Sequence, residues 1–396
     1  MRPAPRVPGV GPPRGWLLGV VALVGALAYL DSLVWVFLLI YAVVLLALLA
    51  AAWSWWCGRH LRLFRETRDG ARVVGQELVE RFTLENDSGL PIRLVEVRDH
   101  SRVPGARATR VVSLAPRQIV TWESTRRLSS RGRYELGPTE LRVADPFGLF
   151  PRRLTQPTSD TLVVHPALVA VPGRSLPGGL ADLARHRKSP ESGKLEPGAQ
   201  GSRSVRRRPG SRTLPGPASA ASTDLLVLLD LCRESHHGEG PDSSLEYAVT
   251  VAASVAHAAA GEGRAVSLAT SDQQLGRIPA GRGELHDRTL LDYLATARDD
   301  GAVPFSELVT GEMTSWRNRG GVVLITADGS LEWVEAVAAA SAPGDRALAI
   351  FLDPAGFSSQ AATKIPAQWR LVMDLWVVHH GDDLARLDAL HGRAVV

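Results

Sequence analysis

The sequence predicts an α/β domain with a parallel-rich sheet and helices on both faces, preceded by a small all-β sandwich and an N-terminal transmembrane helical hairpin. Three observations predict this arrangement. Two apolar runs follow each other within residues 16–56. Short alternating segments fill residues 70–165, and from Asp224 onward short apolar runs alternate with amphipathic helical patterns. Repeated strand–helix units of this kind build parallel sheets that are covered on both faces.

Composition limits the classes of protein to which this chain can belong. Its 396 residues are 45% hydrophobic, and the net charge is +4 with an isoelectric point near 9.4. That charge is too small for a protein that coats nucleic acid, and no specific nucleic-acid partner is expected. The two cysteines, Cys57 and Cys232, provide neither a disulfide framework nor a zinc site.

The N-terminal stretch predicts attachment to a lipid bilayer. Residues 1–15 are rich in Pro, Gly and Arg, which predicts a disordered cytoplasmic tail. The apolar runs Trp16–Leu30 and Leu33–Trp53 predict two transmembrane helices, joined by a tight turn at Asp31-Ser32. Arginines lie on both sides of this hairpin, so both termini are expected in the cytoplasm. A signal-peptide core over Trp16–Leu30 is the alternative.

Residues 70–165 have the spacing of an antiparallel β-sandwich, with turn formers between short strands. The expected strands are 78–84, 92–97, 111–114, 119–122, 134–136 and 141–143. Three carboxylates, Glu77, Glu80 and Glu85, lie along one strand and its ends. A solvated face is the interpretation for these carboxylates, and nothing in this domain indicates catalysis.

Residues 172–222 are dominated by Arg, Pro, Gly and Ser and predict a solvated linker. Because basic residues outnumber acidic ones there, the alternative is a patch for an anionic partner, a lipid surface or RNA, through Arg203–Arg212. No aromatic residues are interleaved with these arginines, which argues against stacking on single-stranded nucleic acid.

The last domain, residues 223–396, is organised around the continuous apolar run Leu225–Leu229. Such a run predicts a strand buried on both faces, and it ends in Asp230. Open α/β sheets bind ligands at the carboxyl ends of their strands, where Asp230 would lie. The other expected strands are 264–269, 321–326, 347–352 and 372–378, and the expected helices are 243–260, 286–298, 331–340 and 382–390.

Two stretches in the β domain carry a resemblance to a known family. Arg131-Gly-Arg-Tyr-Glu-Leu-Gly-Pro138, followed by Asp145-Pro-Phe-Gly-Leu-Phe150, resembles the bacterial family called domain of unknown function 58. The resemblance implies a protein of the bacterial inner (cytoplasmic) membrane with a von Willebrand factor A-like α/β domain. It also implies a MoxR-type AAA+ ATPase and a transglutaminase-like membrane protein as partners. The glycines and prolines of both stretches form turns around strands, which indicates a structural role.

The segment before the central strand departs from the family pattern. Family members carry Arg-x-Tyr-x-Pro-Gly-Asp-Asp, then Trp and Ser-Ala-Arg, whereas Lys194–Gln200 and Ser211–Pro215 lack the acidic pair, the Trp and the Ser-Ala-Arg. For residues 190–222 a frame change, a decayed copy and a real variant are the open hypotheses.

The resemblance also implies the von Willebrand A-type metal motif Asp-x-Ser-x-Ser, and here that motif is degenerate. Cys232 and Glu234 stand where the two serines belong after Asp230. A thiol is a poor ligand for magnesium, which prefers oxygen. A site for magnesium or another divalent cation would use Asp230, Glu234 and Asp328. The favoured interpretation is that no cofactor binds and that Asp230 accepts hydrogen bonds from backbone amides of its own loop.

No other constellation predicts catalysis. The sequence has no Gly-x-Ser-x-Gly elbow and no Walker-type phosphate loop. Ser243 is expected to cap the following helix, His236-His237 to lie in a polar loop, and Cys232 to be unreactive. The sequence therefore predicts a membrane-anchored, non-enzymatic scaffold or adaptor for protein interactions, acting with the ATPase in envelope or complex maturation. The alternative is a divalent-cation-dependent enzyme or adhesion domain that uses Asp230 and Asp328.

Overall fold

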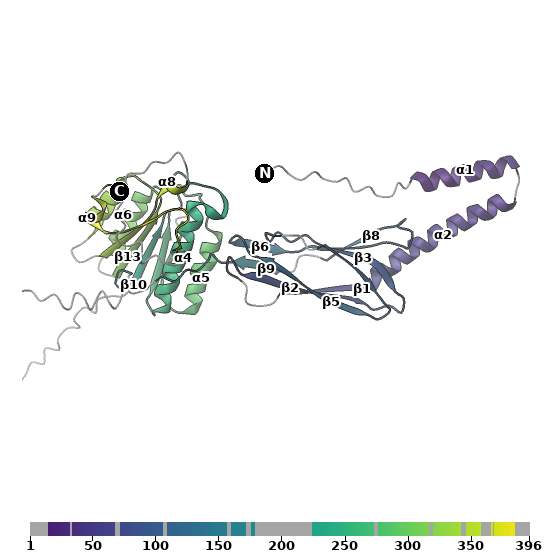
Figure 1. Ribbon diagram of the computed structural model, residues 1–396, viewed down its shortest axis with the longest axis horizontal. Helices are drawn as coiled ribbons and strands as arrows, with labels where there is room; N and C mark the ends of the chain where they lie inside the picture. Colours follow the sequence, from purple (N-terminus) through teal and green to yellow (C-terminus); the bar gives the residue numbers. More distant parts are fainter. Residues whose placement is uncertain are drawn as a thin grey trace, which may run out of the picture. The chain divides into compact units, whose positions relative to one another are not determined.

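The computed structural model describes residues 15–31, 34–67, 72–105, 109–156, 160–171, 176–178, 224–272, 276–316, 320–341, 346–357, 366 and 368–384 (Figure 1). The chain divides into two compact units. The β unit comprises Met1–Ser129 and Arg133–Val164, and the α/β unit comprises Ser130–Gly132 and His165–Val396. The predicted N-terminal tail up to residue 14, most of the linker 172–222, the atypical segment Lys194–Pro215 and most of the helix 382–390 lie outside the described residues.

Two apolar helices begin the described chain, α1 (Gly15–Asp31) and α2 (Val34–Arg59). Only α2 among the described helices is long and apolar enough to cross a membrane, and this helix indicates membrane association. The apolar stretch found within α1, Leu18–Leu27, is shorter, so the second span of the hairpin stays a prediction. Helix α2 continues beyond the predicted end at Trp53 because its last turns pack on the β unit, where Ala50, Ser54 and Cys57 are buried.

The strands of the β unit form two larger antiparallel sheets and one strand pair. The three-stranded sheet has the order β1-β2-β5, the four-stranded sheet β4-β3-β7-β8, and β6 pairs with β9. One apolar cluster contains buried side chains of both larger sheets together with Cys57 of α2. The strands are β1 (Leu61–Thr67), β2 (Glu77–Asn86), β3 (Ile92–Asp99), β4 (Thr109–Leu114), β5 (Ile119–Arg127), β6 (Gly132–Leu136), β7 (Thr139–Val143), β8 (Arg152–Gln156) and β9 (Asp160–Val164).

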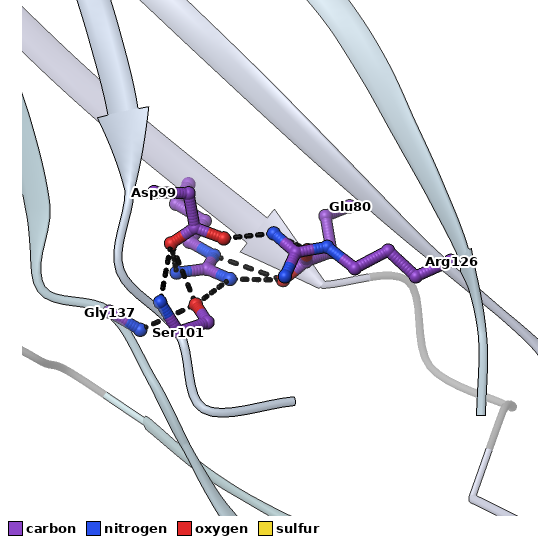
Figure 2. Close-up of polar contacts among 6 residues, drawn as sticks. Glu80, Asp99, Ser101, Arg126 and Gly137 are labelled. Carbon is purple, nitrogen blue, oxygen red and sulfur yellow. Dashed lines mark hydrogen bonds and ion pairs between the residues drawn. The ribbon is translucent and has the colours of Figure 1, made fainter. Parts of the chain in front are cut away.

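A buried ionic cluster lies inside the β unit (Figure 2). Arg126 contacts the carboxylates of Glu80 and Asp99, and Arg65 contacts the same two carboxylates. All four side chains are at most 8% exposed. The interpretation of Glu80 as part of a solvated face is therefore wrong. The inward positions of β2 are the even-numbered ones, so Glu80 points inward between Leu78 and Phe82.

The hydroxyl of Ser101 links this cluster to the turn before β7. Ser101 Oγ donates to Asp99 Oδ1 at 2.7 Å and accepts a hydrogen bond from the amide of Gly137 at 2.8 Å. Burial alone would raise the pKa of Asp99, but the bond from Ser101 and the charges of Arg65 and Arg126 outweigh it and hold that pKa below its usual value.

The α/β unit is built on a six-stranded sheet with the order β12-β11-β10-β13-β14-β15. All neighbouring strands are parallel except the edge strand β12, which runs antiparallel to β11. The strands are β10 (Asp224–Leu229), β11 (Val266–Thr270), β12 (Arg277–Gly281), β13 (Gly320–Thr326), β14 (Arg346–Leu352) and β15 (Asp374–Val378). The helices are η2 (Gly240–Asp242), α4 (Ser244–Gly261), α5 (Glu284–Thr296), α6 (Phe305–Trp316), α7 (Glu332–Ala340), α8 (Pro354–Phe357) and α9 (Trp369–Val372).

The central strand β10 is buried on both faces, as its continuous apolar run predicts. Leu225, Val227 and Leu229 pack with α4 and α5 in one cluster. Leu226 and Leu228 pack with α6, α7 and α9 in the other. Helices therefore cover both faces of the sheet, as Figure 1 also shows.

Several elements of the α/β unit differ from the sequence prediction. Strand β12, helix α6 and the short helices η2 and α8 were not expected. The predicted strand 372–378 begins at Asp374, because the preceding residues form the short helix α9 with the buried Trp369. The predicted helix cap is confirmed, since Ser243 is the N-cap residue of α4 and its hydroxyl accepts the amide of Glu246.

Candidate functional site

The site begins with Asp230, the first residue after the central strand. Its side chain is fully buried at the carboxyl end of β10. Oδ1 accepts the amide of Cys232 at 2.9 Å and the hydroxyl of Ser271 at 3.2 Å, and Oδ2 accepts the hydroxyl of Thr326 at 2.7 Å. Both oxygens of the carboxylate are thus engaged by the protein itself, including the backbone amide predicted from the sequence.

Cys232 joins the loop after β10 to the loop that precedes α6. Its thiol donates to the carbonyl of Val303 at 2.9 Å, and the amide of Gly301 donates to the carbonyl of Leu231 at 3.0 Å. Burial, reinforced by the charge of Asp230, raises the pKa of the Cys232 thiol to about 11. The thiol is therefore protonated at neutral pH, which makes it a poor nucleophile and a poor metal ligand.

His236 has a structural position beneath the same loop. Its Nε2 donates to the carbonyl of Asp230 at 2.9 Å, so its Nδ1 accepts the hydroxyl of Ser244 at 3.1 Å. Burial lowers the pKa of His236 against the opposing effect of Asp230. The imidazole is therefore neutral, and both of its nitrogens are occupied within the protein.

Asp328 forms a turn at the end of β13. Its carboxylate accepts the amide and the hydroxyl of Ser330, each at 2.8 Å, and its carbonyl accepts the indole N–H of Trp333 at 3.0 Å. The same turn leads into α7, whose first turn carries Glu332 and Glu335. Asp328 is thus held in place by its own loop.

A cavity of about 730 Å³ opens between these loops at the carboxyl end of the sheet. Its charged lining residues are Arg233, Glu234, Asp328 and Glu332. Backbone and small side chains of the loops around Gly301 and Gly329 complete its wall. The lining therefore carries three carboxylates and one guanidinium beside apolar side chains such as Phe305 and Pro354.

The three predicted metal ligands do not occupy equivalent positions. Glu234 and Asp328 line the cavity, whereas Asp230 lies buried behind it and is not a lining residue. Within the described part of the chain, no group of three or more His, Cys, Asp and Glu side chains is placed to hold a metal ion. The arrangement fits a resident cation poorly, because the carboxylate of Asp230 is fully buried and does not reach the cavity lining.

Ser271 and Thr326 are the polar partners of Asp230 that the sequence analysis missed. Ser271 follows β11 and Thr326 ends β13, the two strands that flank β10. Because the carboxyl ends of adjacent parallel strands meet at one edge of a sheet, hydroxyl residues after both neighbouring strands were the available signal.

The two stretches that carry the family resemblance have structural positions. Arg131, which belongs to the α/β unit, donates to the carbonyls of Leu294 and Ala297 at 3.2 and 2.8 Å and forms an ion pair with Glu246. Asp145, in the β unit, accepts the amides of Phe147 and Phe150 at 2.9 and 2.7 Å. These contacts agree with the structural role expected for the motifs.

Comparison with known families supports the resemblance. The family model described as "Protein of unknown function DUF58" matches residues 216–354, and this match supports the assignment to that family. The match begins at residue 216, near the end of the atypical segment 190–222, and covers the central strand, the cavity loops and Asp328. No curated protein matches the chain.

Solved structures give only distant similarity. A beta-glucosidase of intestinal bacteria involved in saponin metabolism is 14% identical, with 25% of this chain and 16% of that chain covered at a TM-score of 0.16. The sporulation control protein Spo0M of Bacillus subtilis is 12% identical (26% and 49% covered, TM-score 0.17). The alkylpurine DNA glycosylase AlkC of Pseudomonas fluorescens is 14% identical (35% and 43% covered, TM-score 0.17). The matches span under half the length of each of these structures, and scores this low carry no argument.

Proposed function

We propose that this protein is a membrane-anchored, non-enzymatic scaffold whose α/β unit is von Willebrand A-like and binds a protein partner through the cavity at the carboxyl end of its sheet. The observation that carries this proposal is the state of Asp230. Its carboxylate is buried and accepts three hydrogen bonds from the protein, while the charges of Glu234 and Glu332 lie on the cavity lining. The carboxylates of Glu234 and Glu332 are thus exposed where a partner could contact them, whereas the carboxylate of Asp230 is not.

Two further observations support the proposal. The sheet order, five parallel strands with one antiparallel edge strand, agrees with a von Willebrand A-like domain. The helix α2 supports a membrane anchor, and on the sequence evidence the anchor is a two-helix hairpin in the bacterial inner membrane with both termini in the cytoplasm. By family resemblance the partner is a MoxR-type AAA+ ATPase, and a transglutaminase-like membrane protein belongs to the same assembly.

Charge reversal at the cavity tests the proposal. The full chain with Glu234→Lys and Glu332→Lys is compared with Glu284→Lys, a control at the exposed start of α5, near the opposite edge of the sheet. Affinity purification from membranes of the native host should recover the ATPase with the unchanged chain and the control. The cavity variant should lose the ATPase, because the reversed charges would repel a partner surface that is complementary to the native carboxylates. Equal recovery by all three chains would refute the cavity as the binding site.

A divalent-cation-dependent activity or adhesion is the second candidate, favoured by the presence of Glu234 and Asp328 on one cavity. Calorimetry of the full chain with magnesium and manganese tests it directly. Binding that disappears in both Asp230→Asn and Asp328→Asn would support a cation site. The absence of heat would leave the scaffold as the only candidate.

A further inference from the structure

The end of the β unit from which α2 emerges gathers several loops. Leu61 of β1 pairs with Asn86 of β2, and Ile92 of β3 pairs with Leu114 of β4, so the β2–β3 and β4–β5 loops lie at this end. Strand register also brings the β7–β8 loop towards this end, because β7 runs from Thr139 opposite Asp99, the end of β3, to Arg142 opposite Glu96, and so continues towards the start of β3. Helix α2 packs on both β7 and β8 (Figure 1). We name residues 87–91, 115–118 and 144–151 the α2-end loops.

The packing of α2 limits how much of it can lie in a membrane. Trp53 and Cys57 of the helix belong to the apolar cluster of the β unit, so α2 packs on the strands from Trp53 onward. The part before Trp53 has a length of roughly 29 Å at about 1.5 Å per residue. The hydrocarbon core of a bilayer is about 30 Å thick. If α2 spans the bilayer, the bilayer surface therefore lies at the level of Trp53 or beyond, where α2 already contacts the β unit.

The exposed face of these last turns has the composition of a membrane interface. Trp55 and Trp56 are 47% and 38% exposed, and the guanidinium of Arg59 lies 4.0 Å from the centre of the Trp55 ring. Amphipathic aromatic rings and flanking cations concentrate at the headgroup level of bilayers.

The β7–β8 loop is built to expose an aromatic side chain at this level. Asp145 is buried and accepts the amides of Phe147 and Phe150, and Gly148, with φ of +69°, closes the turn onto the carbonyl of Asp145. The result is a fixed turn that leaves the ring of Phe147 61% exposed.

The neighbouring α2-end loops add apolar and cationic side chains. Leu90 is 44% exposed, and Arg93 and Arg117 are exposed beside it in the same loops and the adjoining strand. Of the two acidic side chains in these loops, Asp145 is buried and Asp87 is paired with His60 and Arg62. This end of the β unit therefore exposes apolar side chains with basic side chains around them.

We infer that the α2-end loops form a second membrane contact, in which Phe147 and Leu90 enter the headgroup region of an anionic bilayer and Arg93 and Arg117 face lipid phosphates. Charge complementarity and continuity with α2 select a lipid surface as the occupant. This contact would hold the β unit against the membrane independently of any partner at the α/β cavity.

Site-specific fluorescence on the full chain tests this inference. An environment-sensitive fluorophore is attached to Phe147→Cys in a Cys232→Ala background, where the remaining cysteine, Cys57, is fully buried. The control is Glu77→Cys, an exposed site at the other end of β2. The labelled chains are reconstituted in vesicles of phosphatidylcholine and phosphatidylglycerol, with nitroxide-bearing lipid as one quencher and aqueous iodide as the other.

The fluorophore at position 147 should be quenched several-fold more strongly by the nitroxide lipid, and less by iodide, than the fluorophore at position 77. Removing phosphatidylglycerol, or introducing Arg117→Glu, should weaken the lipid quenching. Equal iodide quenching at both positions would overturn the inference. Shielding of position 147 from both quenchers would also overturn it, because a protein, such as a second copy of the chain, would then cover the loop.

Discussion

Replacing Asp99 with Asn tests whether the buried ionic cluster stabilises the β unit. Asp99 accepts hydrogen bonds from Ser101 and from Arg65 and Arg126, all three of which lie in the same water-excluded interior. The Asn side chain has nearly the same shape, so the cavity stays filled. The change leaves two guanidinium groups to share the single carboxylate of Glu80. Removing one partner of a buried ion pair costs about 3–5 kcal/mol.

Hydrogen exchange followed by mass spectrometry is the assay, because it reports on β2 and β5 separately from the α/β unit. At about 1.4 kcal/mol per tenfold change, the expected loss of protection in these strands is roughly a hundredfold to several thousandfold. The control is Glu123→Gln, which breaks the Arg81–Glu123 pair of 3.0 Å. Those side chains are 56% and 50% exposed, so a loss below about 1 kcal/mol is expected.

A double variant separates lost charge balance from lost packing. Combining Asp99→Asn with Arg126→Gln leaves Arg65 and Glu80 as a neutral pair, so the double variant should be more stable than the sum of the two single losses predicts. The reasoning is refuted if Asp99→Asn loses no more protection than Glu123→Gln, or if the two single losses simply add.

Four other outcomes follow from the structure. The pKa of Asp99 is lower in the folded protein than in the unfolded chain, so ionised Asp99 stabilises the β unit fully above its unfolded pKa of about 3.9. This stabilisation is lost as the pH falls through the folded pKa. The urea midpoint of the β unit should therefore fall less steeply in acid for Asp99→Asn than for the unchanged chain. Cys232 should resist iodoacetamide at pH 8 and react only as the pH approaches about 11, as measured by mass spectrometry against a denatured sample. Thr326→Val should cost about 1–3 kcal/mol in thermal unfolding, because one oxygen of Asp230 loses its donor. Gly301→Ala should also cost about 1–3 kcal/mol in thermal unfolding, because its Cβ would lie 2.7 Å from the carbonyl carbon of Leu231. The control is Gly311→Ala on α6, whose Cβ would meet no atom within 4 Å.

Elements with a complete local pattern were predictable from the sequence. The apolar run of β10 indicated a strand covered on both faces, and packing on both sides agrees with that. Helix α6 carries buried residues at positions 305, 308, 309, 313 and 316, a helical spacing that was present in the sequence but was not used. Strand β12 has no such signal, because it is a short edge strand that contains a proline and three exposed residues.

The polar interior required long-range information. Glu80 has the inward parity of β2, which the sequence shows, but its partners Asp99 and Arg126 come from two other strands. Without those partners in view, a carboxylate in a strand is most simply read as solvated, because an unpaired charge is almost never buried. The position of Asp230 follows from its own strand, whereas Ser271 and Thr326 can be recognised as its donors only once β11 and β13 are taken to flank β10.

These donors decide how the carboxyl end of the sheet can work. Asp230 receives one hydrogen bond from its own loop, one from the loop after β11 and one from the end of β13, so a single carboxylate ties three strands together. A cation would have to reach a carboxylate that is fully buried and already accepts three hydrogen bonds. The carboxylates of Glu234 and Glu332 take no part in this network, and they line the cavity that the three tied loops surround. In the proposed scaffold, the buried carboxylate would hold the loops and the exposed carboxylates would supply the negative charge that a cationic partner meets.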